Sequence, residues 1–112
     1  MDCIFCKIVA GEIPSPRVFE NDEFIVINDV NPQAKVHLLA IPKEHFADIG
    51  ELDDKRAMVV GRMIKKLGEI AKEMGLDDGY RIVSNKGKFG CQSVMHLHIH
   101  LLGGEQLGEK MN

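Results

Sequence analysis

The sequence contains no tryptophan, and its aromatic side chains are limited to one tyrosine and five phenylalanines. Proteins that bind single strands of nucleic acid stack the bases on aromatic side chains, so this chain lacks such a platform. It also lacks an excess of positive charge, because 14 lysines and arginines stand against 17 acidic residues and leave a net charge of −3. These two shortages argue against a nucleic-acid partner, although a local pocket can still hold a small anion.

No apolar run approaches the ~20 residues of a transmembrane helix, and no basic leader is visible, so we expect no membrane partner and no signal peptide. The three cysteines are an odd number. This count argues against a disulfide framework and for a reducing, cytoplasmic setting. With 112 residues, of which 45% are hydrophobic, the chain is long enough to bury a core as a single domain over residues 1–112.

Hydrophobic periodicity predicts two helices and five strands. The expected ranges are 3–10 and 53–74 for the helices, and 17–20, 24–29, 36–41, 80–84 and 95–102 for the strands. Seven apolar residues at spacings of three and four predict the buried face of the long helix: Val60, Met63, Ile64, Leu67, Ile70, Ala71 and Met74. Because strands and helices do not alternate, the order predicts an α+β fold with a five-stranded, largely antiparallel sheet.

Three histidines occupy alternate positions of the last expected strand: His96, His98 and His100. Side chains alternate across a strand, so the imidazoles share one face and Leu97 and Ile99 share the other. A polar row facing solvent, or half-buried histidines with satisfied rings, is the structural alternative. However, each buried ring needs hydrogen-bond partners that Val or Ile would not. We therefore interpret the row as functional, either as metal ligands or as a nucleophile with imidazole neighbours.

The loop that precedes this strand helps to decide between the two. Gly87 and Gly90 allow its backbone to turn N–H groups inward, and Gln92 and Ser93 add side-chain donors. A loop rich in donors beside a row of imidazoles suits a phosphate, with one imidazole as the attacking group.

Cys3 and Cys6 form a C-x-x-C pair near the start of the chain. Inert buried thiols, a strained disulfide and a redox pair are open alternatives, although the strand–helix context of a thioredoxin-like motif is missing. Such a pair also supplies half of a tetrahedral zinc site, and His45 and His96 can supply the other half. The residues alone leave a zinc site as one interpretation beside these alternatives.

The run His96-Leu97-His98-Ile99-His100-Leu101-Leu102 has the His-x-His-x-His-x-x pattern, with x apolar, of the histidine-triad (HIT) family. The resemblance is to the Hint branch of purine nucleoside phosphoramidases and covers nearly the whole chain; the other matching segments are 3–8, 11–14, 31–34, 41–45, 79–81 and 90–94. It implies a HIT-like fold whose sheet extends across a homodimer.

The resemblance also implies catalytic roles. His98 matches the nucleophile that attacks the α-phosphorus, and His100 matches a contact to the phosphate and the scissile bridging atom. Further contacts on the phosphate side match Ser93, Gln92 and Asn85. Many bacterial members with the cysteine pair bind structural zinc through four positions, which match Cys3, Cys6, His45 and His96. The resemblance therefore implies a closed structural zinc site and no catalytic metal. This zinc would fix His96 and thereby steady His98.

For the nucleoside, Asp29 matches the carboxylate that accepts both ribose hydroxyls. Five residues match the apolar slot around the base: Ile4, Phe5, Ile8, Ile27 and Val30. We interpret His37, a lone strand histidine, as structural. Cys91 stands where relatives usually have glycine, which puts the dihedral angles of that loop in question.

The function implied is hydrolysis of P–N bonds in purine nucleoside phosphoramidates, such as lysyl-AMP-type adducts. The reaction would pass through a nucleotidyl-histidine and release AMP or GMP. Three alternatives stand beside it: a nucleotide- or zinc-binding partner module with little turnover, a dinucleoside polyphosphate hydrolase, and a metallohydrolase that uses the triad as ligands. The tail, residues 105–112, lacks the family's Trp-Pro-Pro ending, so the preference for a leaving group is not implied.

Overall fold

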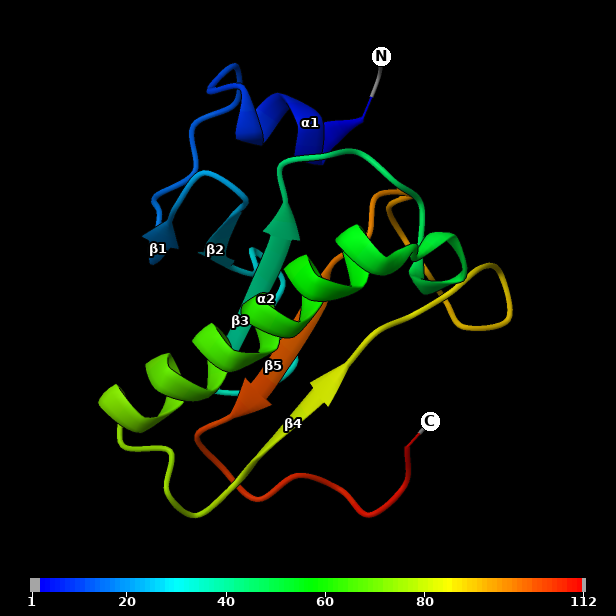
Figure 1. Cartoon of the computed structure of the whole chain (residues 1–112). Coiled ribbons are helices and arrows are strands. Elements are labelled where there is room, and N and C mark those ends of the chain that lie inside the picture. The colour runs from blue at the N-terminus through cyan, green and yellow to red at the C-terminus, as the bar shows by residue number, and fades with distance from the viewer. Residues whose placement is uncertain (1–2, 112) are drawn as a thin grey trace.

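The computed structural model describes residues 3–111, over which two helices and five strands follow one another (Figure 1). In chain order the elements are α1 (Ile4–Val9), β1 (Phe19–Glu20), β2 (Phe24–Asn28), β3 (Val36–Pro42), the short 3-10 helix η1 (Ile49–Glu51), α2 (Asp54–Glu73), β4 (Tyr80–Val83) and β5 (Ile99–Gly103). Within the described residues, neither helix combines the length and the apolar character needed to cross a bilayer.

The five strands form one sheet in the order β1-β2-β3-β5-β4, and each neighbouring pair is antiparallel. The α+β class and the antiparallel sheet are therefore confirmed. β5 lies between β3 and β4, and its register sets His100 opposite Leu39 on one side and Val83 on the other. His100, the last histidine of the row, thus lies inside the sheet, where its position is fixed by two neighbouring strands.

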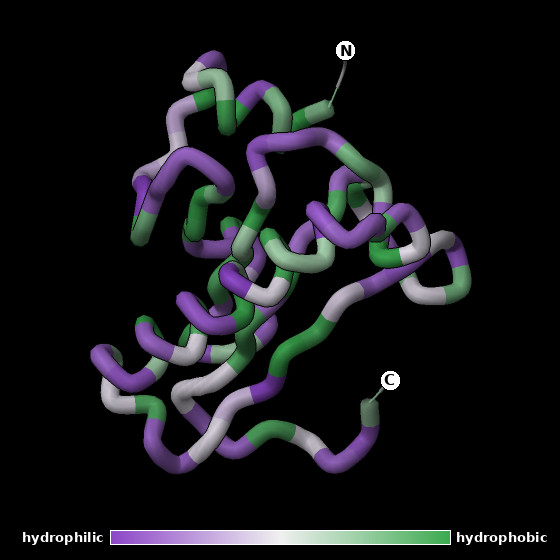
Figure 2. Tube along the Cα trace, viewed as in Figure 1, coloured by the Kyte–Doolittle hydropathy of each residue, from purple (hydrophilic) through white to green (hydrophobic). Residues whose placement is uncertain are grey.

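The two helices cover opposite faces of this sheet. In β2, Phe24 and Val26 pack into the core that α2 covers, whereas Ile25 and Ile27 pack with α1. This alternation explains why four consecutive residues of β2 are all buried. Figure 2 shows hydrophobic residues concentrated along the central strands, and α2 alternating between hydrophobic and hydrophilic residues along its length.

α2 begins at the N-cap Asp53, whose Oδ1 accepts a hydrogen bond of 2.8 Å from the backbone N–H of Arg56, and it ends before Gly75, which has a φ of +75°. Five of the seven residues predicted for its buried face are buried: Val60, Met63, Leu67, Ile70 and Ala71. The prediction is wrong for Ile64 and Met74, which are 43% and 47% exposed. Ile64 lies at the margin of the stripe next to Met63, and Met74 is the C-cap residue.

β5 is shorter than predicted, because it begins at Ile99 and not at residue 95. Ahead of it, the backbone N–H of Leu97 donates to the carbonyl of Phe46 at 2.7 Å, outside any strand pairing. The chain therefore bends through His96 before it enters the sheet. The predicted alternation survives this bend, because Leu97, Ile99 and Leu101 all pack in the core under α2.

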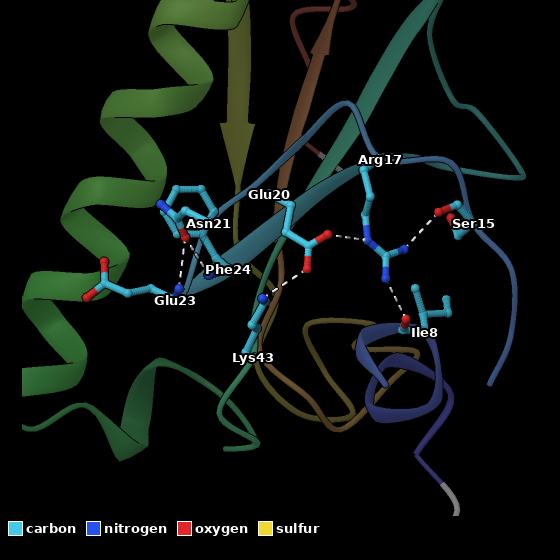
Figure 3. A network of polar contacts seen from close by, with 8 residues as sticks. All are labelled: Ile8, Ser15, Arg17, Glu20, Asn21, Glu23, Phe24 and Lys43. Atoms are coloured by element: carbon cyan, nitrogen blue, oxygen red, sulfur yellow. Dashed lines mark hydrogen bonds and ion pairs between the residues drawn. The ribbon is translucent and has the colours of Figure 1, made fainter. Parts of the chain in front are cut away.

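A polar network fixes α1 to the edge of the sheet (Figure 3). The Arg17 guanidinium donates to the carbonyls of Ile8 at 2.8 Å and Ser15 at 2.7 Å, and to the carboxylate of Glu20 at 3.3 Å. Glu20 in turn lies 2.9 Å from the Lys43 ammonium, just beyond β3. Because the end of α1 is tied to β1 and β3, the cysteines at its start take a defined place over the sheet.

Candidate functional site

The histidine row lies on the face of the sheet that α1 covers. The rings of His98 and His100 are 4.9 Å apart between centroids, and the ring of Phe5 from α1 meets His98 edge-on at 5.0 Å and His96 at 5.9 Å. His96 and His98 are buried, with 0% and 5% of their surface exposed. The structure therefore brings all three histidines of the motif to one side, as the period of two predicts.

His98 has one ring nitrogen occupied and the other available. Its Nδ1 lies 2.8 Å from the backbone carbonyl oxygen of His96, an acceptor that requires a proton on Nδ1. The neutral ring then carries a lone pair on Nε2. Burial lowers the pKa of His98, because the charged imidazolium is poorly solvated there, and the ring stays neutral near pH 7. An oriented neutral imidazole of this kind is a competent nucleophile.

His100 is held by His37, the histidine that we interpreted as structural. The backbone N–H of Gln33 donates to His37 Nδ1 at 3.0 Å, so the neutral His37 ring carries its proton on Nε2. That Nε2–H donates to His100 Nδ1 at 2.8 Å and also lies 3.4 Å from the carboxylate of Asp29. The proton of His100 is consequently on Nε2, which is buried and has no hydrogen-bond partner among residues 3–111.

The tautomers of these rings follow one from another, and burial keeps both rings neutral. Burial, with the neighbouring His98 and His37 as smaller causes, lowers the pKa of His100 to about 4, and burial also lowers the pKa of His37. The sequence pattern did not reveal this contact between His37 and His100. The contact depends on the register of β3 against β5. This register pairs Leu39 with His100 and His37 with Leu102, so His37 and His100 lie diagonally across the two strands.

The second cluster joins Cys3, Cys6, His45 and His96. The His96 Nδ1 atom lies 3.4 Å and 3.6 Å from the two Sγ atoms of Cys3 and Cys6, and 3.1 Å from His45 Nδ1. None of the three cysteines is in a disulfide. Four-coordinate zinc with two sulfur and two nitrogen ligands gives ligand–ligand distances of roughly 3.3–3.8 Å, so these atoms already lie near the corners of such a site.

The other side of His96 supports the same conclusion. His96 Nε2 lies 2.8 Å from the carbonyl oxygen of Pro42, which requires the proton on Nε2 and leaves the Nδ1 lone pair aimed at the cysteines. A ligating histidine typically donates its remote N–H to a carbonyl in this way. Burial raises the pKa of the Cys6 thiol, and a bound cation would offset this by deprotonating it.

Several donors of the glycine loop are used within the protein, among them the N–H groups of Gly87 and Cys91 and the side chain of Gln92. Gln92 Oε1 accepts from the Gly87 N–H at 2.8 Å, and Nε2 donates to the carbonyls of Ala47 at 2.6 Å and Val94 at 3.0 Å. Ser93 is exposed and Asn85 is half-buried. The sequence left the dihedral angles at Cys91 in question. Cys91 has a φ of +58°, in the left-handed region, and no other non-glycine residue among residues 3–111 has a positive φ.

The residues expected around the nucleoside are partly brought together. Phe5, Ile8 and Ile27 are buried in one apolar cluster beneath α1, whereas Ile4 is 47% and Val30 is 90% exposed. Asp29 follows β2, and its Oδ1 accepts a hydrogen bond of 2.8 Å from the backbone N–H of Asn31.

Comparison with known proteins places this fold and this row of imidazoles in one class: the chain belongs to the histidine-triad family. The family model "Scavenger mRNA decapping enzyme C-term binding" matches residues 2–112. A HIT family hydrolase from Clostridium thermocellum superposes with a TM-score of 0.94 at 41% identity, covering 99% of this chain and 97% of the other.

Within the family, the chain is similar to Protein HitA of Neisseria gonorrhoeae, with 47% identity over 91% of this chain and 95% of the relative. The Arabidopsis thaliana protein named Adenylylsulfatase HINT1 is 42% identical over 93% of this chain and 72% of its own length. Zinc is named for two further relatives. The 14 kDa zinc-binding protein of Brassica juncea is 43% identical over 95% of this chain and 96% of its own. A Zn-bound histidine triad protein of Mycobacterium smegmatis has a TM-score of 0.83 at 32% identity, with 100% and 81% of the two chains covered.

Proposed function

We propose that this chain is a homodimeric hydrolase that cleaves the P–N bond of purine nucleoside phosphoramidates, with His98 as the nucleophile. The observation that carries the proposal is the adjacent pair of rings: His98 with an unprotonated Nε2, and His100 with an Nε2–H that has no partner within residues 3–111. The first nitrogen can attack phosphorus, and the second can donate to the oxygens of the same phosphoryl group.

The reaction would run in two displacements. First, the lone pair of His98 Nε2 forms a bond to the α-phosphorus, and the P–N bond breaks as the amine leaves with the bonding electrons and a proton from solvent. Water then attacks the nucleotidyl-imidazole, the His98–phosphorus bond breaks, the nucleoside monophosphate departs, and the proton of the water returns to solvent. The His96 carbonyl accepts from Nδ1–H throughout, and it stabilises the positive ring of the intermediate.

The phosphate would be bound by donors fixed before it arrives. His100 Nε2–H is oriented through His37 and Gln33, so the N–H need not reorganise as charge develops on the phosphoryl oxygens. Ser93 and Asn85 would add side-chain donors. Both Gln92 amide hydrogens are donated to backbone carbonyls, so we do not assign Gln92 a contact with the phosphate.

The nucleoside would lie over the apolar cluster beneath α1. Asp29 would accept the ribose hydroxyls, and Phe5, Ile8 and Ile27 would form the floor under the base, with Ile4 and Val30 at its exposed margin.

The Cys3, Cys6, His45 and His96 cluster would hold a structural zinc ion. Bound zinc would act as a crosslink between α1 and the segments that carry the two histidines. His96 links this cluster to the nucleophile, since its ring faces the cysteines and its carbonyl fixes His98. His96 would thus support catalysis through His98.

The homodimer is proposed from the free edge of the sheet. β4 is the last strand in the order, and Tyr80 and Ile82 on it are 43% and 36% exposed. Met58 and Ile64 of α2 are 61% and 43% exposed. A second copy of the chain would cover this edge and these side chains. Sedimentation as a monomer at micromolar concentration would contradict this part.

The decisive experiment follows AMP release from adenosine 5′-phosphoramidate by the purified protein. We expect wild-type turnover and a loss of at least about 1000-fold in His98→Ala, because the nucleophile is absent. Thermal unfolding and AMP binding of the variant serve as controls for its fold. Intact-mass spectrometry of rapidly quenched wild-type protein should detect a nucleotidyl adduct that His98→Ala lacks. Full activity in His98→Ala would overturn the proposal.

A second candidate substrate is adenylylsulfate, which is favoured by the name of the Arabidopsis relative. Sulfate would take the place of the amine as the leaving group, and His98 would attack the same phosphorus. The assay of both substrates with one preparation measures which bond is cleaved faster.

A further inference from the structure

Gln92 is a buried side chain, 7% exposed, in which every polar atom has a protein partner. Its Oε1 accepts from Gly87, and its two amide hydrogens go to the carbonyls of Ala47 and Val94. A primary amide offers two N–H donors and one carbonyl oxygen, and all of them are engaged. The orientation is fixed by these partners, because the reversed amide would face one N–H with its NH₂ group and two carbonyls with its oxygen.

Two of the three hydrogen bonds of Gln92, those to Gly87 and Ala47, join two stretches of backbone that lie far apart in the sequence. On one side is the glycine loop 87–91, which is closed by Cys91 N–H donating to Lys88 O and by Gln92 N–H donating to Gly87 O, both at 3.1 Å. On the other side is the segment 45–47, which begins with His45. This segment is bound again further on, where Leu97 N–H donates to Phe46 O at 2.7 Å.

These contacts put one side chain between the two functional parts of the molecule. The loop leads to Ser93, on the phosphate side of the site, and the segment 45–47 carries a member of the Cys/His cluster. We propose that Gln92 is a positioning residue: its buried carboxamide fastens the glycine loop to the segment 45–47, and it does not contact the nucleotide. The expected effect of Gln92 on turnover rests on the function proposed above. The expected effect of Gln92 on the glycine loop does not depend on that function.

Nuclear magnetic resonance of the wild-type protein tests the inference directly, because the chain has three glutamines. Gln33 and Gln106 are exposed and serve as internal controls. We expect the Gln92 carboxamide hydrogens to exchange with solvent at least about 100-fold more slowly than those of the other two, since three bonds must open together. Their chemical shifts should change little when AMP is added. Exchange as fast as in Gln33 and Gln106, or an AMP-induced shift larger than that of the Ser93 amide, would overturn the inference.

Two variants complete the test. Gln92→Glu keeps an oxygen for Gly87 but turns the other oxygen toward two carbonyls, and Gln92→Met removes all three bonds at similar length. We expect the Gly87 amide to exchange at least about tenfold faster in both, and the Michaelis constant for adenosine 5′-phosphoramidate to rise about tenfold while kcat changes less than about threefold. The matched control Gln106→Glu should change neither quantity.

The readouts separate this inference from the proposed function. If wild-type protein does not turn over the phosphoramidate, the function fails, but Gly87 exchange still tests the contact. Unchanged Gly87 exchange in a folded Gln92→Met protein would sink the inference even if turnover is normal. Should Gln92→Glu fail to fold, Gln92→Met and the wild-type spectra decide the matter.

Discussion

Two clusters of potential ligands lie on the same face of the sheet, and by distance alone both can hold a metal ion. Cys3, Cys6, His45 and His96 form one, and Asp29, His37 and His100 form the other; in each, the candidate ligand atoms lie within 4.8 Å of one another. The clusters differ at one histidine each, His96 in the first and His37 in the second. The difference is the group that faces the remote ring nitrogen, which is the one pointing away from the cluster: Nε2 in His96 and Nδ1 in His37. His96 presents its remote nitrogen to a carbonyl oxygen, and His37 presents its own to a backbone N–H.

This single difference decides what each cluster can do. The carbonyl at His96 keeps the proton on the remote nitrogen and frees the near lone pair for a cation. The N–H of Gln33 requires an acceptor at His37 Nδ1, so the proton of the neutral His37 ring is on Nε2. Nε2 is the nitrogen that faces the cluster, and a protonated nitrogen cannot bind a cation there. The first cluster therefore directs a free lone pair toward the place where a metal ion would bind, whereas in the second cluster His37 donates a hydrogen bond to His100. His98 belongs to neither cluster, and His96 and His100 belong to different ones, so within the described residues the arrangement argues against a metallohydrolase that uses the triad as ligands.

The largest effect that tests the comparison is the loss of zinc. We expect about one zinc per purified chain, bound at the Cys/His cluster, and almost none in Cys6→Ser. Because zinc would crosslink α1 to the sheet, the melting temperature of Cys6→Ser should fall by on the order of 10 °C or more. Elemental analysis and calorimetry measure both. Cys91→Ser, which changes an exposed thiol outside the cluster, is the matched control and should behave as wild type. A second tightly bound zinc that disappears in His37→Leu would break the comparison.

A smaller effect is expected from His37 itself. His37→Leu removes the donor to His100 Nδ1, so the proton of His100 is no longer confined to Nε2, and kcat should fall by about 10–100-fold. His37→Gln places an amide near the position of the lost Nε2–H and should recover part of the rate. Zinc content should stay constant in both variants. Equal rates for Leu and Gln at this position would show that the donor is irrelevant.

The sequence predicts the composition of the first cluster better than that of the second, for a physical reason. A C-x-x-C pair on one turn of helix and a period of two along a strand are local patterns, and they correctly group Cys3 with Cys6 and His98 with His100. The pairing of His37 with His100 depends on the register of β3 against β5, which local patterns leave undetermined. The bend at His96 was missed for the same reason, since it depends on a tertiary hydrogen bond from Leu97 to Phe46.

The pH dependence of stability should separate the clusters further. The pKa of His100 is about 4 in the folded chain, against an ordinary value of 6.5. Between these values the unfolded chain takes up a proton that the folded chain refuses, so the contribution of neutral His100 is complete above pH 6.5 and is lost as the pH falls toward 4. With allowance for solvent screening, the loss should be on the order of 1–2 kcal/mol. It is measured as the difference in unfolding free energy between wild type and His100→Asn at pH 7 and pH 4.5. Both proteins keep the Cys/His cluster, so a difference that does not vary with pH would contradict the assignment.

The smallest effect concerns Cys91, which lies in the loop that leads to the histidine row and belongs to neither cluster. Its φ of +58° is a left-handed conformation that costs a residue with a Cβ atom about 1–2 kcal/mol and costs glycine little. Cys91→Gly should therefore be more stable than Cys91→Ala by on the order of 1 kcal/mol, since both lack the thiol and only glycine relieves the backbone. Chemical denaturation of the two variants measures this difference, and zinc content and kcat serve as readouts of the two clusters. If neither readout moves while stability rises, the strain is confined to the loop. If kcat falls in Cys91→Gly but not in Cys91→Ala, the restricted backbone at Cys91 helps to orient the loop beside His98. Turnover then depends on this residue as well as on the two clusters.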